Sequence, residues 1–248
     1  MSRHRFFYPF QPHDRQITLD DPDEFMHLAR VLRLKPGDAV EIVNGQGGLA
    51  FGVIREVGRA LAVIAFEKIS QDPGRTAPRL TMVCALPKKA KFETIIEKCT
   101  ELGVDRIIPL MTARTEVDLS GERAGSKQVR YARIVVNAAK QCQRLWFPEV
   151  MAPVTLTQAI SMVSGPGKAV FFPWLEGSRV SLATAFAAHK GAGEVAFFIG
   201  PEGDFTPQEA ALAIGAGAVA VTLGSNVLKV DTAAMAVMAF AVLNEPPA

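Results

Sequence analysis

The segment Ile199–Pro207 reads Ile-Gly-Pro-Glu-Gly-Asp-Phe-Thr-Pro, and a second segment, Leu223–Thr232, reads Leu-Gly-Ser-Asn-Val-Leu-Lys-Val-Asp-Thr. Each segment follows an apolar run that is typical of a buried strand. Glycine, proline and accessible backbone predominate in the turns, whereas side chains that can do chemistry are scarce. Such turns bind a ligand through main-chain N–H and C=O groups. The two segments therefore predict a small-molecule pocket at the carboxyl ends of neighbouring strands.

Outward from these turns, strand-like and helix-like patterns alternate along the chain. Strands are expected at the apolar runs 80–86, 104–110, 169–173, 195–199 and 218–223, with helices over 88–102, 126–144 and 232–243. This alternation predicts an α/β domain with a parallel sheet. Thr206 and Glu209 have the spacing of a capping box, and Pro207 is suited to the first helical position, so a further helix is expected to begin there.

The N-terminal part of the chain has a different pattern. Residues 39–66 alternate and are rich in β-branched side chains, and Asn44–Gly48 is a strong hairpin turn between the first two runs. Three short strands favour a small antiparallel barrel, which follows a helix that is capped by Asp21. Residues 71–79 contain two prolines and few apolar side chains. We therefore expect a β-rich domain over 1–70, a linker over 71–79 and an α/β domain over 80–248.

Composition excludes several classes of protein. Hydrophobic residues make up 49% of the 248 residues, which is ample for a core, and no apolar run approaches the roughly 20 residues that span a bilayer. No secretory leader is apparent, so a cytosolic protein is expected. The three cysteines are isolated and are expected to be buried thiols, and the four histidines lack metal-ligand spacing. We expect no metal.

Basic charge is concentrated in the middle of the chain. Residues 71–150 carry fourteen basic and nine acidic side chains, whereas 1–70 carry nine of each and 151–248 carry four and seven. The helix expected over 126–144 has apolar residues at helical spacing on one side, namely Val129, Ala132, Val136, Ala139 and Cys142, and polar residues on another, namely Arg130, Asn137, Gln141 and Arg144. Such a face fits a polyanion such as RNA, although a solvated charged face gives the same pattern.

The chain resembles a known family, the RsmE methyltransferases of bacterial small-subunit ribosomal RNA, which belong to the SPOUT superfamily. The resemblance is carried by residues distributed over almost the whole chain in the family's order. They are His27 with Arg30–Arg33, the segment Glu97–Val104, the pair Gln141 and Arg144, the turn Ile199–Gly203, and Leu223-Gly224 with Val227-Leu228. Each motif is weak alone, and together they are specific.

The resemblance implies a PUA-like RNA-binding β-barrel over 1–70 and a SPOUT domain over 80–248, with a parallel sheet and a C-terminal trefoil knot. It further implies a homodimer that uses S-adenosylmethionine to methylate uridine N3 in 16S ribosomal RNA within the small subunit. The cofactor would lie among three loops, which are residues 172–177, 199–203 and 223–228. The implied cofactor-binding residues are Phe172, Leu175, Ile199, Gly200, Pro201, Gly203, Leu223, Gly224, Ser225, Val227 and Leu228.

Methylation at uracil N3 requires loss of the imide proton, so a proton acceptor is needed near the methyl group. Glu202, held in a glycine turn, is the candidate catalytic residue, and a bond that stiffens the loop is its alternative role. The candidate RNA-binding residues are Arg5, Arg30, Arg33, Lys88, Lys89, Arg130, Gln141 and Arg144. For each of them the alternative is a charged surface that keeps the protein soluble.

The chain departs from the family pattern in the second turn. Family members commonly have arginine where this chain has Asn226 and Lys229, and glutamate where it has Asp231. An amide cannot replace a guanidinium, so a non-catalytic RNA-binding protein with the same fold is the alternative function. A dinucleotide-dependent oxidoreductase is disfavoured, because the first expected parallel strand is followed by Leu86–Lys89 and not by Gly-x-Gly-x-x-Gly.

Overall fold

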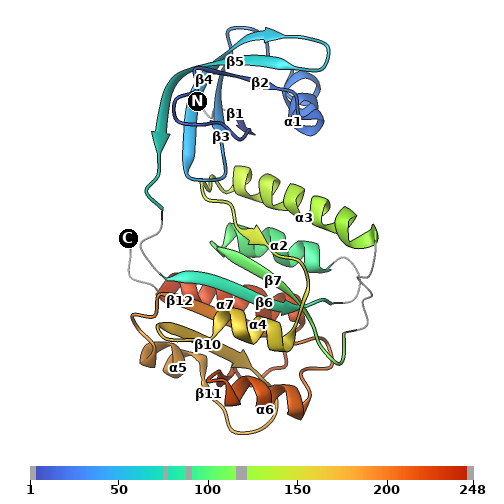
Figure 1. The fold of residues 1–248 in the computed structure, drawn as a ribbon, viewed down its shortest axis with the longest axis vertical. Helices are drawn as coiled ribbons and strands as arrows, with labels where there is room; N and C mark the ends of the chain where they lie inside the picture. Colours follow the sequence, from blue (N-terminus) through green and yellow to red (C-terminus); the bar gives the residue numbers. More distant parts are fainter. Residues whose placement is uncertain (1–3, 75–77, 88–90, 116–121, 245–248) are drawn as a thin grey trace. The chain divides into compact units, whose positions relative to one another are not determined.

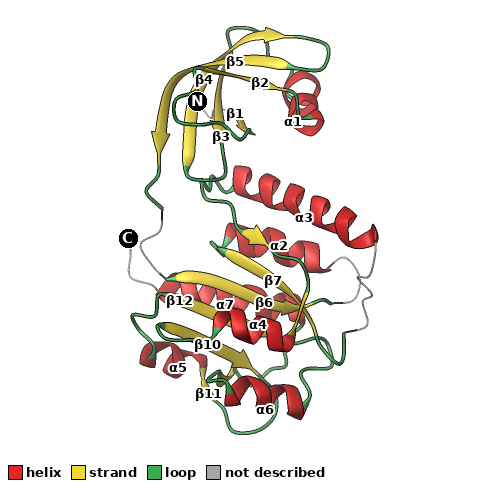
Figure 2. Cartoon of the chain, in the orientation of Figure 1, coloured by secondary structure: helices red, strands yellow, loops and turns green. Residues whose placement is uncertain are grey.

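The computed structural model describes residues 4–74, 78–87, 91–115 and 122–244 (Figures 1 and 2). The chain forms two compact units. The first unit contains the residues up to 74 together with 139–147, and the second contains the remaining residues. The sequence predicted an uninterrupted second domain over 80–248, so the membership of 139–147 in the first unit differs from that expectation.

The first unit is built on a five-stranded sheet. Its strands pair in the order β1 (His4–Phe7), β3 (Ala39–Val43), β4 (Gly48–Val57), β5 (Ala62–Gln71) and β2 (Gln16–Leu19). β1 is parallel to β3 and the other pairs are antiparallel. The sequence predicted β3, β4 and β5, whereas β1 and β2 have only four residues each and were missed.

A short helical segment follows β2. Helix α1 (Pro22–Met26) begins as predicted, because the Asp21 side chain accepts hydrogen bonds from the N–H groups of Asp23 and Glu24 at 3.0 Å. It continues as one π-helical turn, η1 (His27–Val31). The chain then leaves this turn through Arg33, whose φ of 54° lies in the left-handed region.

Residues 139–147 belong to the first unit because they bond to its β3–β4 hairpin. Gly47 N donates to Leu145 O, and Phe147 N donates to Gly45 O, both at 2.9 Å. The Phe7 and Phe147 rings lie 5.4 Å apart. These main-chain bonds have no local sequence signal, so the assignment of this segment could not be predicted from the turn Asn44–Gly48 alone.

The second unit is a parallel α/β domain, as predicted. Its strands are β6 (Arg79–Ala85), β7 (Arg106–Met111), β8 (Glu149–Val150), β9 (Val154–Thr155), β10 (Lys168–Pro173), β11 (Val180–Ser181), β12 (Glu194–Ile199) and β13 (Val219–Thr222). The order is β11-β13-β10-β12-β6-β7-β8, with β9 beside β7, and every pairing in this sheet is parallel. Among the strands, the sequence missed β8, β9 and β11, each two residues long, and it also missed the helices Leu156–Val163 and Leu182–Ala188.

Helices cover both faces of this sheet (Figure 1). One face packs against α4 (Leu156–Val163) and α6 (Pro207–Gly215), with Phe172, Phe198 and Phe205 in a shared core. The other packs against α5 (Leu182–Ala188) and α7 (Val230–Asn244), and α2 (Lys91–Glu101) lies beside α7. The trefoil knot that the resemblance implies stays a prediction.

Helix α3 (Glu122–Gln141) forms, but the face of it that was predicted to be apolar and buried is the wrong one. Val129 is 58% exposed and Ala132 is also exposed, whereas Tyr131, Val135, Ala138 and Ala139 are buried. The predicted stripe and the observed one share Ala139 and are rotated relative to each other on the helix. Both stripes have helical spacing in the sequence. The stripe that contains Tyr131 is the buried one, and the ring centroid of Tyr131 lies 5.3 Å from that of Phe92.

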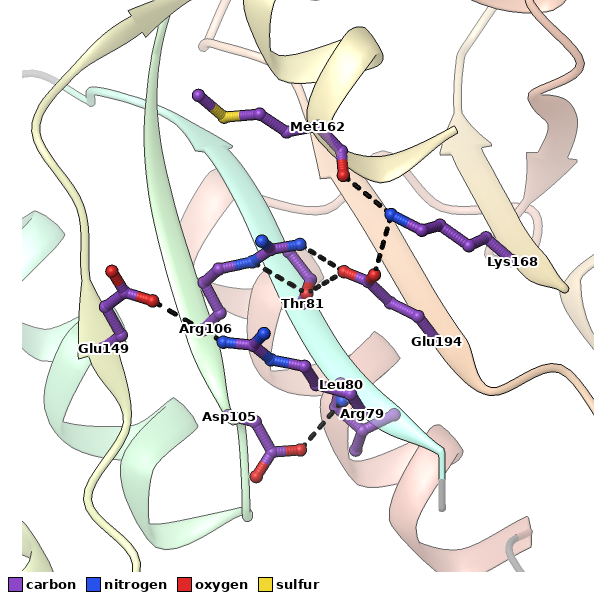
Figure 3. A network of polar contacts seen from close by, with 9 residues as sticks. All are labelled: Arg79, Leu80, Thr81, Asp105, Arg106, Glu149, Met162, Lys168 and Glu194. Carbon is purple, nitrogen blue, oxygen red and sulfur yellow. Dashed lines mark hydrogen bonds and ion pairs between the residues drawn. The ribbon is translucent and has the colours of Figure 1, made fainter. Parts of the chain in front are cut away.

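A polar network joins four strands of the second unit at their amino ends (Figure 3). The Glu194 carboxylate accepts a hydrogen bond from Thr81 Oγ1 at 2.8 Å, pairs with Arg106 and lies 3.1 Å from Lys168 Nζ. The Glu194 and Arg106 side chains are each only 12% exposed. The network therefore links the amino ends of β7, β6, β12 and β10. The predicted pocket lies at the other end of these strands, after their carboxyl-terminal residues.

The cysteines are free, with Cys84 and Cys99 buried and Cys142 half-buried. Burial raises the pKa of Cys99 to about 12, and burial together with the nearby Cys99 and Glu202 raises the pKa of Cys84 well above its usual value. Among the described residues, no three His, Cys, Asp or Glu side chains gather in a way that could hold a metal ion. None of the described helices is long and apolar enough to cross a membrane.

Candidate functional site

The turn after β12 has the structure that its sequence predicts. Thr206 caps α6, since its hydroxyl accepts from Glu209 N at 3.2 Å while the Glu209 carboxylate accepts from Thr206 N at 2.9 Å. Gly200 has no room for a side chain, because a Cβ atom there would lie 3.0 Å from the Phe205 ring and 3.1 Å from Asp204 Oδ1. Glycine at this position lets the turn fold back tightly.

Gly203 lies against the loop after β7. A Cβ atom on Gly203 would lie 3.3 Å from Cδ of Arg114, and the Arg114 guanidinium donates a hydrogen bond to the Gly203 carbonyl. Ala113 N also donates to the Glu209 carboxylate at 2.8 Å. The loop after β7 is thus bound to the outside of the turn through its backbone and one arginine.

The apolar residues of the loop after β13 favour a segment that packs inside the protein, but the structure shows an exposed loop. Val227 is 74% exposed, and residues 224–226 are exposed as well. The loop is shaped by Gly224, whose φ is 123°, and by Thr222, whose Oγ1 accepts from Gly224 N at 3.2 Å. Apolar residues are exposed here because the loop forms the wall of a pocket and is not a core element.

A third loop follows β10. Trp174 N donates to Val221 O of β13 at 3.2 Å, and Arg179 Nη1 donates to Trp174 O at 2.9 Å. Leu175 N donates to Asp204 Oδ2 in the turn after β12 at 2.9 Å. At the carboxyl end of the sheet, the loop after β10 is therefore hydrogen-bonded to strand β13 and to the turn after β12.

These three loops enclose a pocket of about 620 Å³. Ten of the predicted cofactor-binding and catalytic residues line it, namely Leu175, Ile199, Gly200, Pro201, Glu202, Leu223, Gly224, Ser225, Val227 and Leu228. Two do not. Phe172 is fully buried in the core, with its ring 4.3 Å from that of Phe205, and Gly203 faces Arg114 instead.

Several charged residues of the pocket were not predicted as cofactor-binding residues. Lys91 at the start of α2, Arg179, Lys229 and Asp204 all line it. Lys91 and Arg179 lie far from the two glycine turns in the chain, and no local pattern marks them. Asp204 and Lys229 lie inside the quoted segments, so their position next to the glycines was the signal that could have identified them.

The candidate RNA-binding residues fall in both units. In the first unit, Arg30 and Arg33 are exposed on and just after η1, and Gln141 is exposed at the end of α3. Arg5 instead forms an ion pair with Glu41 at 2.7 Å and is 13% exposed, so its guanidinium is not available to a phosphate. Arg144 Nε donates to the Trp146 carbonyl.

In the second unit, Arg130 pairs with Glu93 at 2.7 Å but remains 65% exposed. Lys88 and Lys89 lie outside the described residues. An exposed arginine with one ion-pair partner or none among the described residues still has N–H groups that can donate to phosphate oxygens. A half-buried, paired arginine such as Arg5 does not.

A family model described as an RNA methyltransferase domain matches residues 75–242. The chain belongs to this family. A second model, described as an RNA methyltransferase PUA domain, matches residues 19–66. The family assignment covers the second unit with its pocket, and the PUA match lies within the first unit.

Named relatives of the family are similar over most of the chain. The ribosomal RNA small subunit methyltransferase E of Synechocystis sp. is 34% identical over 91% of this chain and 72% of the relative. The protein of the same name from Mycobacterium bovis is also 34% identical, over 92% of this chain and 87% of the relative. The solved ribosomal RNA small subunit methyltransferase E of Neisseria gonorrhoeae, bound to S-adenosyl methionine, shares the fold with a TM-score of 0.83, at 24% identity over 96% of each chain.

Proposed function

We propose that the chain transfers a methyl group from S-adenosylmethionine to N3 of a uridine in small-subunit (16S) ribosomal RNA. The observation that carries the proposal is the pocket of about 620 Å³ at the carboxyl end of a parallel sheet in a member of an RNA methyltransferase family. Relatives at 34% identity bear the name of a small-subunit ribosomal RNA methyltransferase. Such a reaction would place the protein in the cytoplasm.

The residues of the pocket fit the cofactor. Its volume lies in the range of about 300–1,000 Å³ that is typical of small-molecule sites. Gly224 has open space where a Cβ atom would lie, so a ligand can approach its backbone closely, and Leu223 and Val221 contribute apolar groups to the pocket wall. The indole Nε1 of Trp174, another pocket residue, is buried without a hydrogen-bond partner among the described residues, so a donor is left for an acceptor on a ligand.

S-adenosylmethionine supplies an electrophilic methyl group when it is bound. The chain's own residues must orient the uracil and take its N3 proton as the N–CH₃ bond forms. Glu202 is exposed and lines the pocket, so its carboxylate oxygen can accept that proton. Lys91 and Lys229 also line the pocket, and their positively charged ammonium groups stabilise the negative charge that develops on the uracil oxygens.

The test is transfer of labelled methyl groups from S-adenosylmethionine to small ribosomal subunits that lack the modification, followed by mapping of the labelled nucleotide. Label at N3 of a single uridine is the expected result. Binding of S-adenosylhomocysteine without any label in RNA would favour the second candidate function, a non-catalytic RNA-binding protein. Asn226 motivates that alternative, since it places a neutral amide on the pocket wall where the family pattern has arginine.

We further propose that the protein acts as a homodimer formed through α7. One face of α7 is buried, with Ala234, Val237 and Met238 fully inside. Ala236 and Leu243 are exposed on the helix, and Leu243 is 82% exposed. These two exposed apolar residues are the observation that supports an interface on this helix. Sedimentation should give twice the mass of the chain, and Leu243→Arg should shift it toward the monomer.

A further inference from the structure

Asp204 occupies a backbone conformation that favours glycine. Its φ is 59°, in the left-handed region, and it lies between Gly203 and Phe205 in the turn after β12. Glycine adopts this conformation without steric cost, and aspartate tolerates it better than most residues. Compared with glycine, aspartate adds a carboxylate at this position. Asp204 lines the pocket and is half-buried.

Both carboxylate oxygens of Asp204 are used. Oδ1 accepts from Phe205 N at 2.8 Å, which is a bond within the turn, and Oδ2 accepts from Leu175 N at 2.9 Å. Leu175 belongs to the loop after β10, 29 residues earlier in the chain. The second bond therefore joins two different walls of the pocket.

The turn that carries Asp204 is itself fixed from outside. Arg114 donates to the Gly203 carbonyl, and Ala113 N donates to Glu209 at 2.8 Å. The loop that carries Leu175 is held at Trp174, whose N–H reaches Val221 O at 3.2 Å. Because each loop is anchored at another point, a single bond between Asp204 and Leu175 is enough to set the separation of the two walls.

We propose that Asp204 is a positioning residue that holds the Leu175 loop against the turn after β12 and so sets the width of the cofactor pocket. The identity of the ligand rests on the proposed function, whereas the link between the loops does not. The N–H of Leu175 is committed to the carboxylate, so at this residue the wall presents the half-exposed leucine side chain and the carbonyl to a ligand.

The first experiment measures amide hydrogen exchange at Leu175 by NMR in protein without cofactor. In Asp204→Gly the backbone keeps its conformation but loses the carboxylate, so exchange at Leu175 should accelerate by about tenfold or more. Asp204→Asn retains one acceptor oxygen and should lie between the two. Glu176→Gln removes a charge from the same loop without touching the bond and should exchange like the wild type. Unchanged exchange in Asp204→Gly would overturn the proposal.

The second experiment measures cofactor binding and kinetics. Asp204→Gly should bind S-adenosylhomocysteine about tenfold more weakly and raise the KM for S-adenosylmethionine by a similar factor, with kcat at saturation within about twofold. Its melting temperature without ligand should fall by only a few degrees, because two hydrogen bonds are lost, so binding is compared at a temperature at which both proteins are folded. Equal affinity in the two proteins would contradict the role in the pocket. If Leu175 exchange changed as expected but wild-type protein bound no S-adenosylhomocysteine, the proposed function would fail and the link between the loops would stand.

Discussion

Glu202 is the carboxylate on which the proposed mechanism depends, and it lines the pocket. Its neighbour Asp204 is a second carboxylate in the same turn, yet both Asp204 oxygens already accept main-chain N–H groups. The Asp204 carboxylate therefore links main-chain groups of two loops, whereas the Glu202 side chain is exposed at the pocket. The two acidic residues therefore have different roles, although they are only two positions apart.

Glu202→Gln should separate catalysis from binding. The amide cannot take the N3 proton, so kcat should fall by about 10²- to 10⁴-fold, which is the range of general base catalysis. S-adenosylhomocysteine affinity should change by no more than about twofold, because the backbone of the turn stays intact. Calorimetry and methyl transfer to small subunits would measure the two quantities. Full activity in this variant would mean that Glu202 only stiffens the loop.

At the scale of elements, the ion network of Figure 3 holds the amino ends of four parallel strands. Glu194→Gln removes the only carboxylate that Figure 3 places between Arg106 and Lys168 and leaves these two cations with a neutral partner. We expect a loss of about 3–5 kcal/mol in the free energy of unfolding, as for other broken buried pairs.

Glu149→Gln is the matched control for this network. Its carboxylate lies 3.5 Å from Arg79 at the same edge of the sheet, but the two side chains are 59% and 48% exposed. An exposed pair of this kind contributes about 0–1 kcal/mol. Chemical denaturation of both variants compares them directly, and equal losses would show that burial at Glu194 does not matter.

The segment η1 and its end offer a test of RNA contact. Arg30 and Arg33 are exposed, and Arg33 leaves the helix with φ at 54°. If both contact phosphates, replacing both by alanine should weaken RNA binding and reduce the slope of log K against log salt by about two. Arg5→Ala is the control, since Arg5 is held by Glu41 and should leave the slope unchanged. An unaltered slope in the double variant would exclude phosphate contacts at these arginines.

Most of the longer elements could be predicted from the sequence because their signals are local, although the helices α4 and α5 were missed. The capping box of Thr206 and Glu209 placed the start of α6 at Pro207, and the apolar run 195–199 placed β12. Strands of two residues gave no pattern, and α3 presented two possible apolar stripes. Exposure of the loop 223–228 was also missed, since apolar side chains in a pocket wall look like core residues in a sequence. Lys91 and Arg179 reach the pocket only through the tertiary fold.

At the scale of the whole molecule, the buried thiols make the free energy of unfolding decrease as the pH rises above about 9. The pKa of Cys99 is about 12 in the folded chain, whereas an unfolded thiol titrates near its ordinary value of 9.0. Between these values the unfolded state has lost its proton and the folded state has not, so stability falls as pH rises. The contribution of Cys99 is fully present below about pH 9 and is lost above it by about 1.4 kcal/mol per pH unit.

Denaturation at pH 8, 9, 10 and 11 would measure this loss. Cys99→Ala removes the titrating group, so its stability should fall less steeply with pH than that of the wild type, even if the smaller side chain lowers stability at every pH. Cys142→Ala is the control, because Cys142 is only half-buried. Parallel curves for wild type and Cys99→Ala would contradict the pKa assignment.

The membership of residues 139–147 in the first unit limits how the protein can be dissected. The chain passes from the first unit to the second, back again and forward once more, so no single cut separates them. A fragment that ended at residue 74 would lose Leu145 O and Phe147 N as partners of the hairpin. It would also lose Lys140, the cation that pairs with the buried Glu24. A first unit that can be expressed alone would therefore need a grafted copy of this segment, joined by a designed linker.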